Sequence, residues 1–315
     1  MAWKVLVVGL GQIGLRYDLD KPDDLVETHA RAFHLHPSFS LSAGFDPDPS
    51  NRALLEKRYR APSFSELGQA CAQVLPDVVV IASPTPMHLS NLKNVLGACR
   101  PSVVLMEKPA AYSRAEAVEM AHLARVAGVP VLMNFIRRTD PAVREIGRRI
   151  SAGEIELSCK GVVWYGKGII HSGCHFTDLM ASWLGGFDSM EVLGQASGRY
   201  EHDLDIDVHA RFGESEVYFL APGGRRTLYY GADLLFANGK LVYGSAGRAV
   251  RWEAHSAAGS DPGSVVIADG LSRYQLNVVA DLAAFLDRGE TCLPTLEDHI
   301  ANLTPVYTFM EGRAG

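Results

Sequence analysis

The feature that most constrains this fold is a glycine-rich turn directly after an apolar run near the amino terminus. Residues 4–8 have the pattern of a buried strand. The turn has the spacing Gly-x-Gly-x-x-Gly and consists of Gly9, Leu10, Gly11, Gln12, Ile13 and Gly14. The first glycine permits the sharp bend, the second lets a pyrophosphate approach the backbone, and the third lets helix and strand pack closely. The N–H groups of a following helix can bind phosphate. The turn therefore predicts dinucleotide binding, and the alternative is a plain glycine turn.

Short apolar runs alternate with helical stretches over the first 135 residues, which is typical of βαβ units around a parallel sheet. The expected strands are residues 4–8, 41–45, 62–64, 77–82, 102–106 and 130–134. Helices are expected at 85–99 and 113–127, where Ser113 with Glu116 is a capping box and Gly128 ends the second helix. The prediction is an α/β domain over residues 1–136 with a Rossmann doubly wound parallel sheet.

The remaining residues, 137–315, predict a second domain of α+β type. A short helix at 141–150 precedes strand-like runs at 162–165, 208–212, 217–220, 226–230, 240–243 and 249–252. Gly223-Gly224 and Asn238-Gly239 are typical of hairpin turns, so the sheet is expected to be open and mostly antiparallel. The helical stretches 272–288 and 295–310 could pack back on the first domain. We expect a homodimer or homotetramer through the open sheet face, with runs 208–212 and 217–220 supplying apolar side chains.

Composition excludes several classes of protein. The chain is 315 residues long, 47% hydrophobic and 21% charged, as globular proteins are. Its 30 basic and 36 acidic residues give a net charge of 30 − 36 = −6 without a basic block, which argues against nucleic-acid binding. No signal peptide and no run of about 20 apolar residues is present, so no membrane association is expected. Five scattered cysteines without CxxC spacing indicate reduced thiols in a cytoplasmic protein.

The end of the second expected strand bears on the choice of dinucleotide. Asp46 stands where a carboxylate can bind the ribose hydroxyls of adenosine and repel the 2′-phosphate of NADP, so NAD is favoured. The spacing from Gly14 is longer than usual, because residues 17–28 form an apparent insertion before the helix resumes at His29. The alternative is that Asp46 only caps a turn before Pro47.

Three further motifs follow the fourth, fifth and sixth expected strands. They are Ser83-Pro84-Thr85 with His88, then Glu107-Lys108-Pro109, then Asn134 with Arg137 and Arg138. With the glycine turn, these motifs resemble the glucose-fructose oxidoreductase, inositol dehydrogenase and MocA family of NAD(P)-dependent oxidoreductases across the whole first domain. The resemblance implies NAD as cofactor, with NADP as the alternative. The implied cofactor-binding residues are Gly9, Gly11, Gln12, Ile13, Gly14, Asp46, Ser83, Pro84, Thr85, His88, Glu107, Lys108 and Asn134.

Lys108 is the first candidate catalytic residue. Ligands bind at the carboxyl ends of parallel strands, and a lysine there can hydrogen-bond the reacting hydroxyl and share in its proton transfer. Taken alone, Lys108 could equally be a solvated surface cation. The resemblance also implies that the Lys108–Pro109 bond is cis.

The resemblance implies a second catalytic element, in which an aspartate is followed four positions later by a histidine and three positions after that by another aspartate. His175 matches the histidine and Asp178 the second aspartate, but His171 replaces the first aspartate, which leaves the proton path open. Without the resemblance, His171, Cys174, His175 and Asp178 could be a metal cluster or structural residues. We expect catalytic use of His175, with His171 as a further candidate, and no metal.

The substrate is expected to be a sugar, sugar nucleotide or polyol, because residues 165–171 resemble a branch of the family common in surface polysaccharide and glycoconjugate pathways. Arg137, Lys167 and Asp178 are the candidate substrate-binding residues, and the two cations could instead be ion-pair partners. The predicted function is an NAD-dependent oxidoreductase. The alternatives are a redox-neutral lyase or hydrolase that uses tightly bound NAD, and a non-catalytic dinucleotide-binding regulator.

Overall fold

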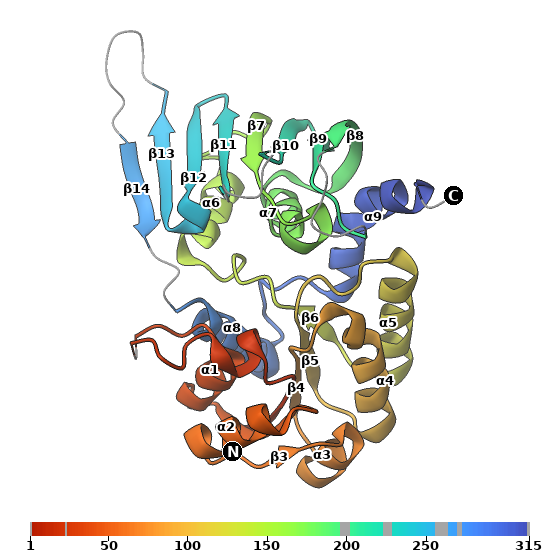
Figure 1. Ribbon diagram of the computed structural model, residues 1–315. Helices are drawn as coiled ribbons and strands as arrows, with labels where there is room; N and C mark the ends of the chain where they lie inside the picture. Colours follow the sequence, from red (N-terminus) through yellow and green to blue (C-terminus); the bar gives the residue numbers. More distant parts are fainter. Residues whose placement is uncertain are drawn as a thin grey trace. The chain divides into compact units, whose positions relative to one another are not determined.

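The computed structural model describes residues 2–22, 24–195, 202–222, 229–255, 264–269 and 273–313, and the chain divides into two compact units. Unit 1 comprises Met1–Thr139 and Ser272–Ile300, and unit 2 comprises Asp140–Leu271 and Ala301–Gly315. The chain therefore returns to unit 1 after most of unit 2. This return brings helix α8 (Tyr274–Arg288) against helix α1 (His29–Leu35), as the blue and red ribbons in Figure 1 show.

Unit 1 contains a parallel sheet with the strand order β3-β2-β1-β4-β5-β6, which is the order of dinucleotide-binding doubly wound sheets. The strands are β1 (Trp3–Val8), β2 (Phe39–Phe45), β3 (Ser63–Phe64), β4 (Val78–Ile81), β5 (Val103–Met106) and β6 (Val131–Met133). Every residue of β4 and β5 is buried, as in strands that are covered on both faces. The predicted Rossmann sheet is confirmed.

Most helices of unit 1 lie between these strands along the chain, whereas α8 follows unit 2's strands. Besides α1 and α8 they are α2 (Pro49–Tyr59), α3 (Leu67–Val74), α4 (His88–Ala98) and α5 (Arg114–Ala127). Ser113 caps α5 by accepting the N–H of Glu116 at 3.3 Å. Gly128 ends α5 with a φ of +66°, a left-handed conformation that glycine adopts without strain.

Unit 2 contains an eight-stranded sheet with the order β14-β13-β12-β11-β7-β10-β9-β8. The strands are β7 (Cys159–Trp164), β8 (Phe187–Gln195), β9 (Ile206–Phe212), β10 (Ser215–Leu220), β11 (Gly231–Phe236), β12 (Gly239–Gly244), β13 (Ala249–Ala254) and β14 (Ser264–Asp269). Neighbouring strands are antiparallel except β7 and β10, so the predicted mostly antiparallel sheet is confirmed. Helices α6 (Pro141–Ser151) and α7 (Cys174–Leu184) pack against it (Figure 1), and α9 (Leu296–Gly312) is the last helix.

Two expectations about unit 2 need correction. Of the strand expected at 226–230, the described residues 229 and 230 are not in a strand, and β11 runs from Gly231 to Phe236. Residues 223–224, 226–228 and 272, which belong to expected elements, lie outside the described residues. Four apolar side chains of the runs expected to supply the open face, Val208, Phe212, Val217 and Phe219, are instead buried. The alternate positions, His209, Arg211 and Tyr218, are more exposed, since successive side chains of a strand point to opposite faces.

Within the described ranges, no helix has the length and apolar character needed to span a bilayer.

Candidate functional site

Of the three glycines in the turn, Gly9 and Gly14 have no room for a side chain, whereas Gly11 has open space beside it. Gly9 has a φ of +96°, and a Cβ atom there would lie 2.6 Å from the backbone nitrogen of Ser83. A Cβ on Gly14 would lie 2.0 Å from the carbonyl oxygen of Gly9. A Cβ on Gly11, in contrast, would meet no protein atom within 4 Å. Packing of the chain itself therefore requires Gly9 and Gly14, whereas the open side of Gly11 fits the close approach of a dinucleotide pyrophosphate.

The helix expected after the glycine turn is only one turn long, Gln12–Arg16. The N–H groups of Leu15 and Arg16 both bond the carbonyl of Gly11, at 3.0 and 3.1 Å, and α1 begins only at His29. The first N–H groups of this single turn have no carbonyl partner within the turn, so they remain available to a phosphate. The dipole of one turn is smaller than that of a full helix.

The described residues of the intervening segment, 17–22 and 24–28, are held together by buried Asp18. One oxygen of its carboxylate accepts the backbone N–H groups of Glu27 and Thr28 at 2.8 and 2.9 Å. The guanidinium of Arg31 donates to the Asp18 carbonyl at 2.9 Å, and Thr28 caps α1. Because the two ends of the segment are bonded to each other, His29 has a defined position at the start of α1.

Asp46 links the end of β2 to the glycine turn. Its Oδ2 accepts the N–H of Leu10 at 2.7 Å, and its Oδ1 accepts the N–H of Asp48 at 2.8 Å. The turn-capping geometry considered as the alternative is therefore present. Each carboxylate oxygen has a second lone pair, so ribose hydroxyls can still bind there. The guanidinium of Arg52 donates to the carbonyls of Asp46 and Pro47, each at 2.8 Å, which puts a cation at the same strand end.

The motif after β4 is held by the side chain of His88, which is 1% exposed. Its Nε2 lies 2.9 Å from the carbonyl oxygen of Ser83, and its Nδ1 lies 3.1 Å from that of Ala110. Burial lowers the pKa of His88, and a neutral ring donates to only one of these carbonyls. The ring thus joins the Ser83 loop to the loop after β5. Pro84 and Thr85 start the short turn Thr85–Met87.

Glu107, after β5, belongs to a buried polar cluster. Its Oε1 accepts hydrogen bonds from Asn134 Nδ2 at 2.6 Å and from His29 Nε2 at 2.8 Å, and Asn134 also donates to Gln275 at 3.3 Å. Burial by itself raises the pKa of the Glu107 carboxyl. The bonds from His29 and Asn134 and the nearby charge of Lys108 outweigh burial and lower that pKa below its ordinary value. The carboxylate therefore carries its charge at neutral pH.

The Lys108–Pro109 bond is cis, as the resemblance implied. Next to it, the N–H of Ala110 donates to Nε2 of buried His299 at 3.2 Å. Burial first, and then the charge of Lys108, lowers the pKa of His299 to about 3, so its ring is neutral. His29, Gln275 and His299 were missed by sequence reasoning, because each lies far along the chain from the residues it contacts and no motif marks it.

In unit 2, two carboxylates accept hydrogen bonds from the backbone of residues 168–171, the segment that contains His171. Buried Asp203 accepts the backbone N–H groups of Ile170 and His171, each at 2.8 Å. Asp205 accepts the N–H of Gly168 at 2.7 Å, and a Cβ on Gly168 would lie 2.0 Å from Asp203 Oδ2. A carboxylate therefore accepts a hydrogen bond from the backbone at position 171, where the resemblance implied an aspartate and the chain has a histidine.

The other predicted residues lie on or next to these elements. His175 and Asp178 are in the first two turns of α7, and Asp178 is buried. Lys167 is exposed before the short turn Ile169–Gly173, whereas Arg137 is buried in unit 1. Among the described residues, no three His, Cys, Asp or Glu side chains are grouped as metal ligands.

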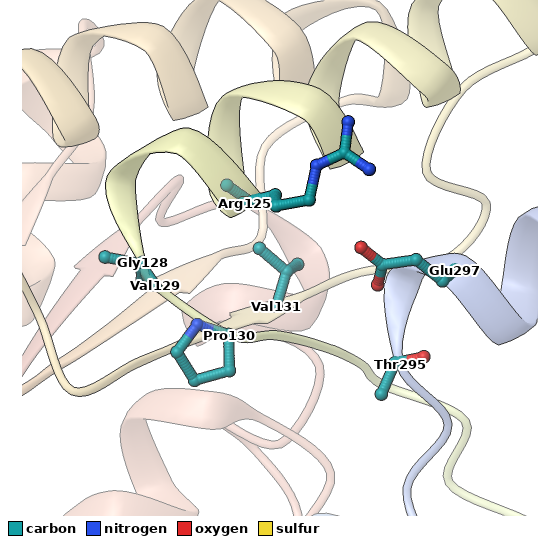
Figure 2. Close-up of a pocket in the computed structure, with 8 residues that line it drawn as sticks. Arg125, Gly128, Val129, Pro130, Val131, Thr295 and Glu297 are labelled. Carbon is teal, nitrogen blue, oxygen red and sulfur yellow. The ribbon is translucent and has the colours of Figure 1, made fainter.

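A hollow of about 230 Å³ lies elsewhere in unit 1, at the amino end of β6. Figure 2 shows its floor, Gly128 to Val131, with Arg125 and Glu297 at its sides. Val131 is the first residue of β6 and Asn134 follows the last, so the hollow is at the opposite edge of the sheet from Asn134 and the other strand-end residues of unit 1.

The strand order and the glycine turn define unit 1 as a dinucleotide-binding Rossmann unit. Residues 3–135 match the family model described as "Oxidoreductase family, NAD-binding Rossmann fold". The amino-terminal part of this chain is therefore similar to the Gfo/Idh/MocA oxidoreductases.

A curated relative is the scyllo-inositol 2-dehydrogenase (NAD⁺) of Bacillus subtilis, 34% identical over 183 residues. The match spans 50% of this chain and 51% of that enzyme. Among solved structures, the UDP-N-acetylglucosamine 3-dehydrogenase of Acidithiobacillus ferrooxidans has a TM-score of 0.76 at 14% identity, covering 98% of this chain and 99% of that one. The WlbA dehydrogenase of Bordetella pertussis, in complex with NADH and UDP-GlcNAcA, has a TM-score of 0.78 at 16% identity, covering 99% and 96%. At these identities the two structures show a shared fold.

Proposed function

We propose that this protein is an NAD-dependent dehydrogenase that acts on a hydroxyl or keto group of a sugar, sugar nucleotide or polyol. One observation carries the proposal. The open space beside Gly11 and the side chain of Lys108 both follow the carboxyl ends of strands in the same parallel sheet. The inositol dehydrogenase relative and the two sugar-nucleotide dehydrogenases support the substrate class. NAD, when bound, would accept a hydride from the substrate carbon.

The residues proposed to hold the dinucleotide follow the strand ends in order. Gly11 with Gln12 and Ile13 would face the pyrophosphate, and Asp46 the adenosine ribose. Ser83, Pro84 and Thr85 would line the path to the ends of β5 and β6. Glu107 and Asn134 would meet the nicotinamide half, because those strands lie on the other side of the switch in strand order from β2.

Lys108 is proposed to hydrogen-bond the reacting hydroxyl and to share in its proton transfer. The candidates contributed by unit 2 are His175 as a second proton-handling group and His171, whose backbone Asp203 holds. Arg137, Lys167 and Asp178 are proposed to bind polar groups of the substrate. A role in surface polysaccharide or glycoconjugate synthesis follows only if the substrate is a sugar nucleotide.

A screen of sugars, sugar nucleotides and inositols tests the proposal. We expect at least one of them to reduce NAD⁺ at a rate that a metal chelator does not change, measured by NADH absorbance. NADP⁺ is run in parallel and is expected to react more slowly, because Asp46 repels its 2′-phosphate. The NADP⁺ arm is included because the Arg52 guanidinium lies at the same strand end and could attract that phosphate. Copurified NAD with turnover of a sugar but no net NADH would instead support the redox-neutral alternative.

We also propose that the protein forms a dimer or tetramer through the open face of the eight-stranded sheet. Tyr218 and Leu235 are 38% and 52% exposed at positions that alternate with buried residues of β10 and β11. Light scattering is expected to give an oligomeric mass for the wild type. The double variant Tyr218→Glu, Leu235→Glu is expected to give a smaller mass. Val126→Glu, at an exposed position of α5, is the matched control and should leave the mass unchanged. A monomeric wild type would contradict the proposal.

A further inference from the structure

Four polar side chains from distant parts of the chain meet inside unit 1. His29 opens α1, Glu107 follows β5, Asn134 follows β6, and Gln275 lies in the first turn of α8. His29 and Gln275 are 0% exposed and Asn134 is 1% exposed, while the Glu107 side chain is 12% exposed. Glu107 is the centre of the cluster, because a single carboxylate oxygen accepts bonds from both His29 and Asn134.

The hydrogen bonds of the cluster determine the role of each atom. A carboxylate oxygen only accepts, so Nε2 of His29 must carry the hydrogen that it shares with Glu107. His29 Nδ1, Asn134 Oδ1 and Gln275 Nε2 have no hydrogen-bond partner in the part of the chain that the structure describes. Buried polar atoms left in this way destabilise a fold, and apolar residues of similar shape would not. The cluster is therefore poorly explained by stability alone.

The main chain and the side chain of Glu107 are held by different groups. Its backbone N–H donates to the carbonyl of Ile81 at 2.9 Å, which fixes the strand end against β4. The orientation of its carboxylate depends on His29 and Asn134. Asn134 directly follows a strand of the sheet, whereas His29 is the first residue of α1. Its position depends on the hydrogen bonds of Asp18 to the backbone of Glu27 and Thr28.

We propose that His29 is a positioning residue, which orients the Glu107 carboxylate at the strand end that takes the nicotinamide half of the dinucleotide. The insertion at residues 17–28 then has a function, since it delivers His29 to Glu107 although the helix after the glycine turn stops at Arg16. This inference rests on the proposed function.

Two amide variants of His29 test the proposal. Glutamine places its amide nitrogen where Nε2 of histidine lies, whereas asparagine reaches only as far as Nδ1. We expect His29→Gln to bind NADH within about twofold of the wild type, and His29→Asn to bind about tenfold more weakly, because only the former can donate to Glu107. NADH affinity is measured by fluorescence titration of the full-length protein. The thermal midpoints of the two variants are expected to agree, since both introduce a neutral amide at the same site.

The Glu107→Gln background provides the second measurement. If His29 acts through the carboxylate, adding His29→Asn to Glu107→Gln should weaken NADH binding no further. The proposal would be overturned if His29→Gln and His29→Asn bound NADH with equal affinity. It would also be overturned if His29→Asn weakened NADH binding as much in the Glu107→Gln background as in the wild type. Failure of the wild type to bind NADH would refute the proposed function instead, so the two failures are distinguishable.

Discussion

Replacing Lys108 with methionine is expected to lower turnover by about 10²- to 10⁴-fold, the usual contribution of a general acid or base. Methionine keeps an unbranched stem but removes the ammonium, whose charge acts on Glu107 and His299 in the structure. NADH affinity is expected to stay within about threefold of the wild type, because Gly11 and Asp46 are unchanged. Steady-state rates with the substrate from the screen and NADH titration measure the two quantities.

Lys93→Met is the matched control for this prediction. Lys93 is an exposed lysine of α4 that pairs with Glu119 at 2.6 Å, so its replacement should change neither rate nor affinity. An unchanged rate for Lys108→Met would rule out the proposed role of Lys108. If the wild type also fails to turn over any compound of the screen while it still binds NADH, the non-catalytic regulator becomes the better description.

Replacing Gly11 with alanine is expected to weaken NADH binding by about 10- to 100-fold, the effect of one overpacked methyl group at a close contact. The thermal midpoint should not fall, because a Cβ at Gly11 meets no protein atom within 4 Å. Gly14→Ala is the contrasting variant, in which the new Cβ would lie 2.0 Å from the Gly9 carbonyl oxygen. That variant should lower the thermal midpoint, measured without cofactor.

The contrast between these two glycines separates binding from folding. Wild-type NADH affinity in Gly11→Ala would show that the pyrophosphate does not approach this position. A thermal midpoint of Gly14→Ala equal to that of the wild type would contradict the tight packing of the turn.

The sheet of unit 1 could be predicted from the chain because its signals are local. Buried parallel strands are continuous apolar runs, and each of the six runs became a strand within a few residues of the expected bounds. The glycine spacing, Asp46 and the Glu107-Lys108-Pro109 motif each follow a strand directly. Since the carboxyl ends of parallel strands share one edge, local order already places these residues on the same side of the sheet.

The sequence by itself therefore determined the class of fold, the edge of the sheet where a dinucleotide could bind, and the lysine at that edge. Only the tertiary structure decided what surrounds them. His29, Gln275 and His299 reach the ends of β5 and β6 from segments remote in sequence, and residues 272–300 return to unit 1. The physical reason is that periodicity and motif spacing report on neighbours along the chain, whereas the hydrogen-bond partners of a buried side chain depend on how distant segments pack.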